Sequence, residues 1–290
     1  MMGSFRRRKG PSVALVGVGL AATLVLTGCS QGATAQPGSP AADGLPSEHV
    51  HGISRDPGSG KVNLATHTGI FVLQSDANWQ RVGPEVDFMG FAISGPGTFY
   101  GSGHPGAGVD LPVPVGLIKS TDAGRTWTSL SRGGKSDFHA LTASSSGVMA
   151  FDGALATTKD GQTWSPGALP GEPSALAAAP DGSQVLATTN QGVLSSTDEG
   201  LTWVPLASAP PLFLASWADS KTVAGVTTQG ELAVSEDAGG SWKIGAAKVS
   251  SAQAASANRD KAGVLEILVV TDTGVLQSRD SGATLTSLKS

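Results

Sequence analysis

The sequence is poor in the residues on which several common protein classes depend. Its 290 residues include one Cys and one Tyr, and only 14% of them are charged. A single Cys excludes a disulfide scaffold and any metal site built from several thiolates. The low charge, beside 40 Gly and 17 Pro, argues against coiled coils and helical bundles. A formal net charge of −4 provides no broad basic surface, so we expect no nucleic-acid partner.

Short signatures of several enzyme classes are missing as well. The chain contains no Gly-x-Ser-x-Gly elbow, no P-loop and no His-Glu-x-x-His segment. After the N-terminal region, no stretch is long and apolar enough to span a bilayer. Candidate functional residues must therefore come from the pattern that the rest of the chain repeats.

The first 28 residues have the composition of a secretion signal. Residues 6–9 are basic, a short apolar stretch follows from Pro11 to Leu26, and Cys29 comes directly after Thr27 and Gly28. This pattern resembles the lipobox of bacterial lipoproteins, in which the Cys becomes the acylated N-terminus. The resemblance implies a signal peptide over 1–28, a lipid on Cys29 and a location on the outer face of the bacterial cytoplasmic membrane. The alternative is a short transmembrane anchor with an incidental Cys.

Residues 29–47 form the next segment, which is rich in Gly, Ala, Ser and Pro. This composition predicts a flexible tether between the lipid and a folded domain over 48–290. Removal of residues 1–28 takes away four of the 19 basic residues and none of the 23 acidic ones. The mature chain is then clearly acidic, which again excludes nucleic acid as a partner.

A short polar motif recurs through the rest of the chain. Ser-Thr-Asp-Ala-Gly-Arg-Thr-Trp at 120–127 returns with changes at 196–203, 235–242 and 278–285, in a shorter form at 158–164, and in a degenerate form at 75–79. We expect the Asp to cap turn amides, the Gly to adopt a positive φ and the Trp to pack against a sheet. The Asp residues are therefore given a structural role and not a catalytic one. They are Asp122, Asp160, Asp198, Asp237 and Asp280.

The motif resembles the Asp-box, or BNR, repeat of sialidases, sortilin-type receptors and photosystem II assembly-factor-like propellers. Each repeat divides into four strand-like segments, as at 174–180, 184–189, 192–197 and 202–207. A period near 40 residues with four strands is typical of a β-propeller. The prediction is an all-β fold, a six-bladed propeller of four-stranded antiparallel blades with no shared closing blade. Seven blades would need a repeat that the sequence does not contain.

The five His residues all lie before residue 140. Alignment of HGIS, MGFA and HALT puts His51, Met89 and His139 at the start of the innermost strands of three successive blades. His67 and His104 fall at the second-to-third strand turns of the first two blades. The propeller resemblance implies that these two kinds of position share one end of the ring. We therefore expect His51, His67, His104 and His139 on one face, with His49 outside the group.

Carboxylates are expected at the same end of the ring. Asp87 and Asp137 precede innermost strands, Asp152 lies at a turn, and Asp110 lies on the longest loop. Imidazole and carboxylate groups suit zinc, copper or iron, or general acid–base chemistry. The sequence thus predicts a ligand-binding face for a metal, a glycan or a partner protein. A divalent metal held by the four His residues is the only cofactor that it suggests. Arg132 and Tyr100 complete the candidate ligand-binding residues.

Whether the chain is an enzyme stays open at this stage. The resemblance to sialidases implies an arginine triad and a Tyr nucleophile, but the few Arg residues outside the signal and the repeated motif are scattered, and Tyr100 is the only Tyr. Sialidase activity is therefore not expected. Another glycosidase mechanism needs two carboxylates across the scissile bond, and Asp110 and Asp137 are the candidate pair. A binding module, a glycosyl hydrolase of the Asp-box type and an assembly scaffold without a small-molecule site are the three interpretations.

Overall fold

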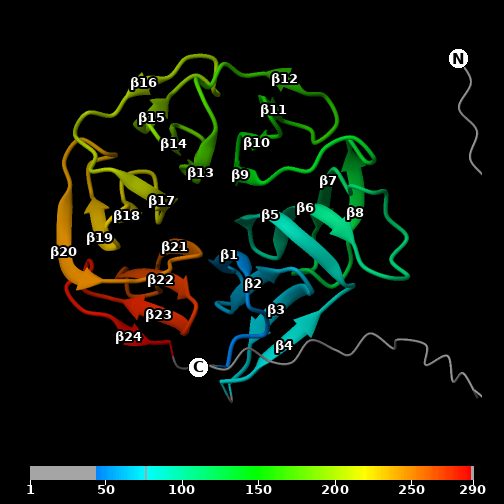
Figure 1. Cartoon of the computed structure of the whole chain (residues 1–290), viewed down its shortest axis with the longest axis horizontal. Coiled ribbons are helices and arrows are strands. Elements are labelled where there is room, and N and C mark those ends of the chain that lie inside the picture. Colours follow the sequence, from blue (N-terminus) through cyan, green and yellow to red (C-terminus); the bar gives the residue numbers. More distant parts are fainter. Residues whose placement is uncertain (1–43, 76, 289–290) are drawn as a thin grey trace, which may run out of the picture. The chain divides into compact units, whose positions relative to one another are not determined.

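The computed structural model describes residues 44–75 and 77–288, and every regular element in these ranges is a β-strand. Twenty-four strands form six antiparallel sheets of four, each made of strands that are consecutive in the sequence. Figure 1 shows the sheets arranged around a centre as the blades of a propeller. The predicted all-β, six-bladed fold is therefore confirmed. Within the described ranges, no helix could cross a membrane.

The strands of each blade run outward from the centre in sequence order. Blades one and two consist of β1 (Val50–Arg55), β2 (Val62–Thr66), β3 (Gly69–Leu73), β4 (Trp79–Val82), β5 (Val86–Gly95), β6 (Thr98–Pro105), β7 (Leu117–Ser120) and β8 (Thr128–Ser131). Blades three and four consist of β9 (Ala140–Ser144), β10 (Gly147–Phe151), β11 (Leu155–Thr158), β12 (Ser165–Pro166), β13 (Pro173–Ala178), β14 (Val185–Thr189), β15 (Gly192–Ser196) and β16 (Val204–Pro205). Blades five and six consist of β17 (Leu212–Trp217), β18 (Val223–Thr227), β19 (Glu231–Ser235), β20 (Lys243–Lys248), β21 (Ala254–Arg259), β22 (Leu265–Thr271), β23 (Gly274–Ser278) and β24 (Thr286–Ser287).

The core of the molecule lies between the blades. Each of six hydrophobic clusters joins two neighbouring blades, as Leu64 of blade one and Leu268 of blade six illustrate. The second strands β2, β14, β18 and β22 are buried along their whole length and consist mainly of Val, Leu, Ala and Thr. Small and β-branched residues suit a strand that is covered on both faces. A single blade cannot bury both of its faces, so the repeats stabilise one another.

The repeated polar motif forms the turn between the third and fourth strands. Asp122 Oδ1 accepts a hydrogen bond from the Thr126 amide at 2.9 Å, and its Oδ2 accepts one from the Thr126 hydroxyl at 2.6 Å. Ser120 Oγ accepts the Gly124 amide, and the Trp127 indole donates to the Gly124 carbonyl at 3.1 Å. Gly124 has a φ of 84°, which favours glycine. The two carboxylate bonds recur at Asp198, Asp237 and Asp280.

The shorter copy of the motif differs in detail. Asp160 accepts hydrogen bonds from the amides of Gln162 and Thr163 at 2.8 and 2.7 Å. In the last copy Leu285 replaces the Trp and packs against the cluster between blades five and six. Asp76 of the degenerate copy lies outside the described residues. The five described Asp side chains thus accept hydrogen bonds within their own turns.

The ring closes between blades six and one without a shared sheet, as predicted. Side chains join the two blades instead. Arg55 at the end of β1 donates from Nε and Nη2 to the two carboxylate oxygens of Glu266 on β22, at 2.6 and 2.8 Å. Gln253 accepts the Val50 amide and donates to the Glu48 carbonyl. We call the junction between blades six and one the seam. Glu266 is buried, so this bidentate ion pair is a structural contact of the seam.

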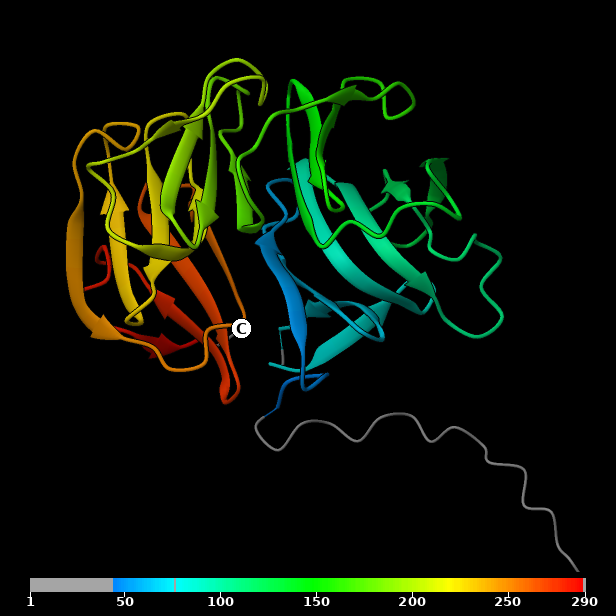
Figure 2. The ribbon, with the colours of Figure 1, turned by 45° about the horizontal axis from the view of Figure 1, so that its top comes forward.

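The centre of the ring is narrow. A cavity of about 190 Å³ runs between the six innermost strands and is lined by residues of all of them, many of them Ala and Ser. Figure 2 shows the ring tilted, with the innermost strand of each blade toward its centre. The channel can hold a few water molecules but no sizeable ligand. A larger ligand would therefore bind outside this channel.

Candidate functional site

The innermost strands share a local irregularity at one end. The register of β1 shifts between Val50 and Gly52, so His51 is the extra residue of a β-bulge. Equivalent shifts in β5, β13 and β17 make Met89, Ser174 and Phe213 the extra residues of blades two, four and five. Bulges often redirect a side chain beside a functional site. The predicted equivalence of His51 and Met89 therefore has a backbone cause.

The chain around each bulge alternates between a buried residue and two accessible ones. In blade one Val50 is buried between His49 and His51. The same pattern gives Asp87-Phe88-Met89 and Glu172-Pro173-Ser174. Asp137-Phe138-His139 has it too, directly before β9, which has no bulge. The buried middle residue anchors the segment, and its two neighbours lie on the opposite side of the extended chain. Each of these blades thus presents two side chains at the same end of the ring.

His67 connects three of these side chains, those of His49, His51 and Asp87, across blades one and two. His67, in the turn between β2 and β3, places its Nδ1 2.6 Å from Asp87 Oδ1. Its Nε2 lies 3.2 Å from the Nε2 of His51. The two imidazole rings meet edge to face with centroids 4.6 Å apart, and the His49 ring stands at 5.6 Å from His67. His49 therefore belongs to the group from which the sequence analysis left it out.

The environment of His51 favours its neutral form. Burial is the main cause that lowers its pKa, followed by the neighbouring His67 imidazole. Asp87 acts in the opposite direction, and His139 and His49 lower the pKa further. A neutral imidazole can accept a proton or coordinate an electrophile.

A second group of contacts connects blades two and three. Asp137 Oδ2 lies 3.0 Å from His139 Nε2 and 3.7 Å from His104 Nε2. The other oxygen of this carboxylate is buried and has no hydrogen-bond partner among the described residues. His104 lies in β6 opposite Asp87 of β5 and not in a turn, because these two strands are longer than their counterparts. The two groups of contacts are therefore neighbours.

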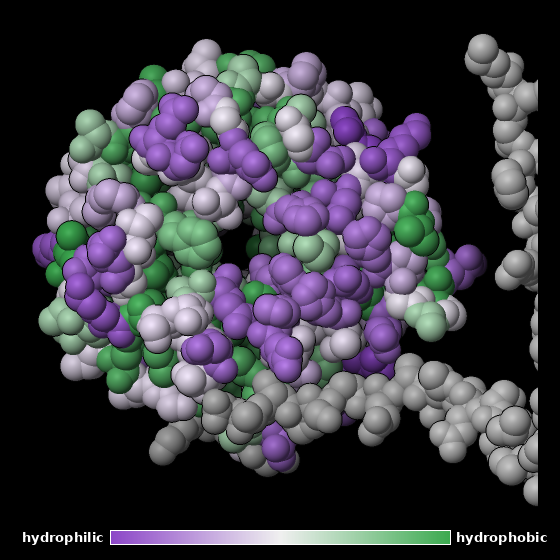
Figure 3. All heavy atoms as spheres, viewed as in Figure 1, coloured by the Kyte–Doolittle hydropathy of each residue, from purple (hydrophilic) through white to green (hydrophobic). Residues whose placement is uncertain are grey.

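We call these connected side chains the histidine cluster. It consists of His49, His51, His67, Asp87, His104, Asp137 and His139. Figure 3 shows hydrophilic side chains gathered on one side of the central opening, over the blades that carry these residues. Of the four His residues singled out in the sequence, His51 and His67 lie in the first group of contacts, and His104 and His139 lie in the second.

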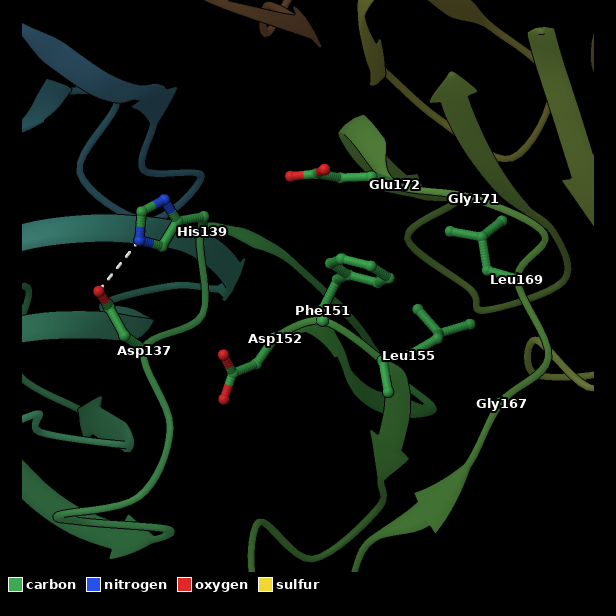
Figure 4. A pocket seen from close by; sticks show the side chains of 11 residues that line it. Asp137, His139, Phe151, Asp152, Leu155, Gly167, Leu169, Gly171 and Glu172 are labelled. Atoms are coloured by element: carbon green, nitrogen blue, oxygen red, sulfur yellow. Dashed lines mark hydrogen bonds and ion pairs between the residues drawn. The ribbon is translucent and has the colours of Figure 1, made fainter. Parts of the chain in front are cut away.

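A cavity of about 760 Å³ opens beside the cluster. Three carboxylates, those of Asp137, Asp152 and Glu172, line it together with the His139 imidazole. Figure 4 shows Glu172 pointing across the opening toward His139, with Phe151 and apolar side chains beneath. The cavity therefore combines hydrogen-bond acceptors with an apolar floor. Its size is that of a small-molecule site.

Asp110, Arg132 and Tyr100 lie apart from this cavity. Asp110 is exposed on the loop between β6 and β7 and does not line the cavity, so Asp152 and Glu172 rather than Asp110 accompany Asp137. The Arg132 guanidinium stacks over the Trp164 ring at 4.9 Å. The Tyr100 ring lies 5.3 Å from Lys119 Nζ. Arg132 and Tyr100 thus make packing contacts of the blades.

The sequence analysis did not single out Glu172, because the segments that it aligned begin at His51, Met89 and His139. Extension by two residues gives His49, Asp87, Asp137 and Glu172 at equivalent places, each before a buried residue. That pattern was available in the sequence.

No group of three or more His, Cys, Asp or Glu residues in the described ranges is arranged to hold a metal ion. The predicted four-His metal site is therefore not formed as a set, and only His51 and His67 direct their nitrogens at one another.

Comparisons with known proteins support the fold. No protein-family model and no curated protein matches the chain. It is similar to a GH74 enzyme of Niastella koreensis, at 17% identity and a TM-score of 0.56 over 83% of this chain and 37% of that one. It is also similar to an ancestral GH74 enzyme, at 13% identity and a TM-score of 0.52 over 87% and 38% of the two chains. A third match is YCF48 bound to D1 peptide, at 15% identity and a TM-score of 0.50 over 82% and 81%.

The chain spans little more than a third of the length of the two GH74 enzymes. At these identities the similarity establishes the propeller fold alone. Activity must be argued from the histidine cluster and the cavity beside it.

Proposed function

We propose that this chain is a lipid-anchored, extracytoplasmic binding propeller that takes its ligand at the histidine cluster. The observation that carries the proposal is the gathering of five imidazoles and two carboxylates, from three adjacent blades, into two neighbouring groups of contacts at one end of the ring. A scaffold that binds through its sides and loops has no need of such a group. Accessible polar side chains concentrated at one end of a rigid ring are typical of a binding face.

The N-terminal segment supports the proposed place of the protein in the cell. The basic and apolar residues before Cys29 support secretion and acylation. Residues 29–47 would then tether the propeller to the outer face of the cytoplasmic membrane. Signal processing is testable by mass spectrometry of the membrane-extracted protein. The expected N-terminal peptide begins at an acylated Cys29, and a chain that retains residues 1–28 would contradict this part of the proposal.

Binding at the cluster is tested by thermal shift of the full chain. The probes are Zn²⁺, Cu²⁺, chitohexaose and polygalacturonate fragments, which represent the metal and glycan classes. A ligand at a hundred times its dissociation constant stabilises by about 2.7 kcal/mol, or a rise of roughly 5–10 °C in Tm for a domain of this size. The double variant His51→Ala/His139→Ala should fold and lose that rise.

The matched control is Ser174→Ala, which changes the same bulge position in blade four, outside the cluster. It should keep the full rise in Tm. No shift with any probe, or an equal shift in the double variant, would contradict binding at the cluster and leave the assembly scaffold as the better interpretation.

A glycosyl hydrolase is the second candidate, and the cavity favours it. Asp137, Asp152 and Glu172 line one opening, and paired carboxylates across a glycosidic bond perform acid–base hydrolysis. GH74 enzymes are among the similar structures. If a polysaccharide is turned over, Asp152→Asn and Glu172→Gln should each reduce kcat by 100-fold or more, on the order of a lost general acid or base. Asp110→Asn, outside the cavity, should not. A kcat equal to that of the wild type in all three variants would exclude this mechanism.

A further inference from the structure

We propose that His51 and His67 hold a divalent transition-metal ion, copper or zinc, between their Nε2 atoms, and that Asp87 positions His67 for it. This inference rests on the proposed function and names the class of ligand at the histidine cluster. It involves two protein ligands, with the remaining coordination positions open to water or to a bound molecule. It therefore differs from the four-His set that the sequence suggested.

The distance between the two nitrogens fits a shared ion. Zinc–imidazole bonds are about 2.0–2.1 Å, so two nitrogens on one ion lie about 2.9–3.4 Å apart for angles between square-planar and tetrahedral values. The Nε2 atoms of His51 and His67 are 3.2 Å apart. The ring planes are inclined at 78° to one another, so the two rings do not stack.

The second nitrogen of His67 is held as metal-binding imidazoles usually are. Its Nδ1 donates to Asp87 Oδ1 at 2.6 Å, which places the proton on Nδ1 and leaves the lone pair on Nε2. That lone pair is directed at His51. The chain Asp87–His67–ion would thus join blade two to blade one.

The choice of ion follows from the donor atoms. Imidazole nitrogens suit copper and zinc, whereas calcium and magnesium take oxygen ligands. No third side chain is arranged with this pair in the described part of the protein. His49 stands beside His67 at this end of the ring.

A direct hydrogen bond between His51 and His67 would have the same length, and the experiment must separate the two. The full chain, purified without a histidine tag, is titrated with Cu²⁺ and Zn²⁺ by calorimetry, with Mg²⁺ as the negative probe. We expect one ion per chain. His51→Ala and His67→Ala should each weaken binding by at least tenfold. The matched control Ser174→Ala, at the equivalent bulge position of blade four and outside the cluster, should change it less than threefold.

The role of Asp87 must be tested by a measurement that the loss of a purely structural contact would leave unchanged. Asp87→Ala should weaken Cu²⁺ binding by about 10- to 100-fold, the usual effect of losing such a partner, and Asp87→Asn, which keeps an acceptor oxygen, should lose less. Electron paramagnetic resonance of the Cu²⁺ complex should report two imidazole nitrogens in the wild type and one in His51→Ala. Circular dichroism checks that each variant is folded.

Two outcomes would overturn the inference: no binding of Cu²⁺ or Zn²⁺ by the wild type, or equal binding by the His51→Ala/His67→Ala double variant. If an oligosaccharide still raises the Tm through His51 and His139, the proposed function stands and the metal inference alone has failed. If no probe binds, both have failed.

Discussion

At the scale of the residue, the turn carboxylates couple the fold to pH. The pKa values of five Asp residues are lowered from 3.8 to about 2: Asp122, Asp160, Asp198, Asp237 and Asp280. At Asp198 the hydroxyl of Thr202 is the main cause, followed by its amide. Since the folded-state pKa lies below the unfolded one, the ionised groups stabilise the fold above about pH 4. That contribution is lost as the pH falls toward 2.

We therefore expect the Tm to fall steeply between about pH 4 and pH 2. Calorimetric melts across this range measure it. Asp198→Asn keeps one acceptor oxygen but loses the charge, so it should lower the Tm near pH 7 and reduce the fall on acidification. Asp110→Asn, at an exposed loop position, is the control and should follow the wild type. A wild-type Tm that stays level down to pH 2 would show that these turns contribute no pH-dependent stability.

Single residues also mark the limit of what the sequence predicts about the site. His51 and His139 could be placed because three short segments align at the starts of innermost strands. The hydrogen bond from His67 to Asp87 and the contact of His49 with His67 depend on how blade one faces blade two. The position of Asp110 depends on the path of a long loop, which no repeat constrains. Contacts between blades therefore had to come from the structure.

At the scale of the strand, the bulge in β5 brings two innermost strands very close. A Cβ added at Gly90 would lie 2.4 Å from the Phe138 carbonyl oxygen and 3.1 Å from Leu141 Cβ. Strand β9 cannot yield to it without moving the segment that carries Asp137 and His139. The glycine is thus required by close approach of two backbones.

Gly90→Ala is expected to destabilise the protein by about 1–3 kcal/mol, as overpacking of a closely packed region does. Gly95→Ala is the matched control in the same strand, since a Cβ there meets nothing within 4 Å. Urea denaturation of the two variants compares their free energies of unfolding. Gly90→Ala should also lower the affinity of the histidine cluster for its ligand. Equal stability of the two variants would mean that the strands can separate freely at this point.

At the scale of the whole molecule, the repeats were enough to predict the architecture. Each blade needs neighbours to bury its second strand, so six copies of one motif predict a closed ring of six blades. The absence of a shared closing sheet was predicted, but the side-chain contacts between blades six and one were not. Arg55 and Glu266 are 211 positions apart, and neither lies in a repeated motif. Such a pair carries no local signal, because only the closed ring brings the two residues together.

The seam pair gives the last prediction. Glu266 is only 3% exposed and accepts hydrogen bonds from both Arg55 and Gln277. Removal of one partner from a buried ion pair costs about 3–5 kcal/mol, so Glu266→Ala should reduce the free energy of unfolding by that amount. Glu266→Gln keeps an acceptor oxygen and should cost less.

The equivalent contact between blades five and six supplies the control. Arg259 and Asp219 form an ion pair that is about a third exposed, and Asp219→Ala should cost about 1 kcal/mol or less. Hydrogen exchange should then locate the effect, because Glu266→Ala removes a contact of the seam alone. Amides of β1 and β22 should exchange faster, while those of β13 and β14, on the far side of the ring, stay protected. Faster exchange in all blades alike would mean that the propeller opens as one cooperative unit and that the seam is not its weakest junction.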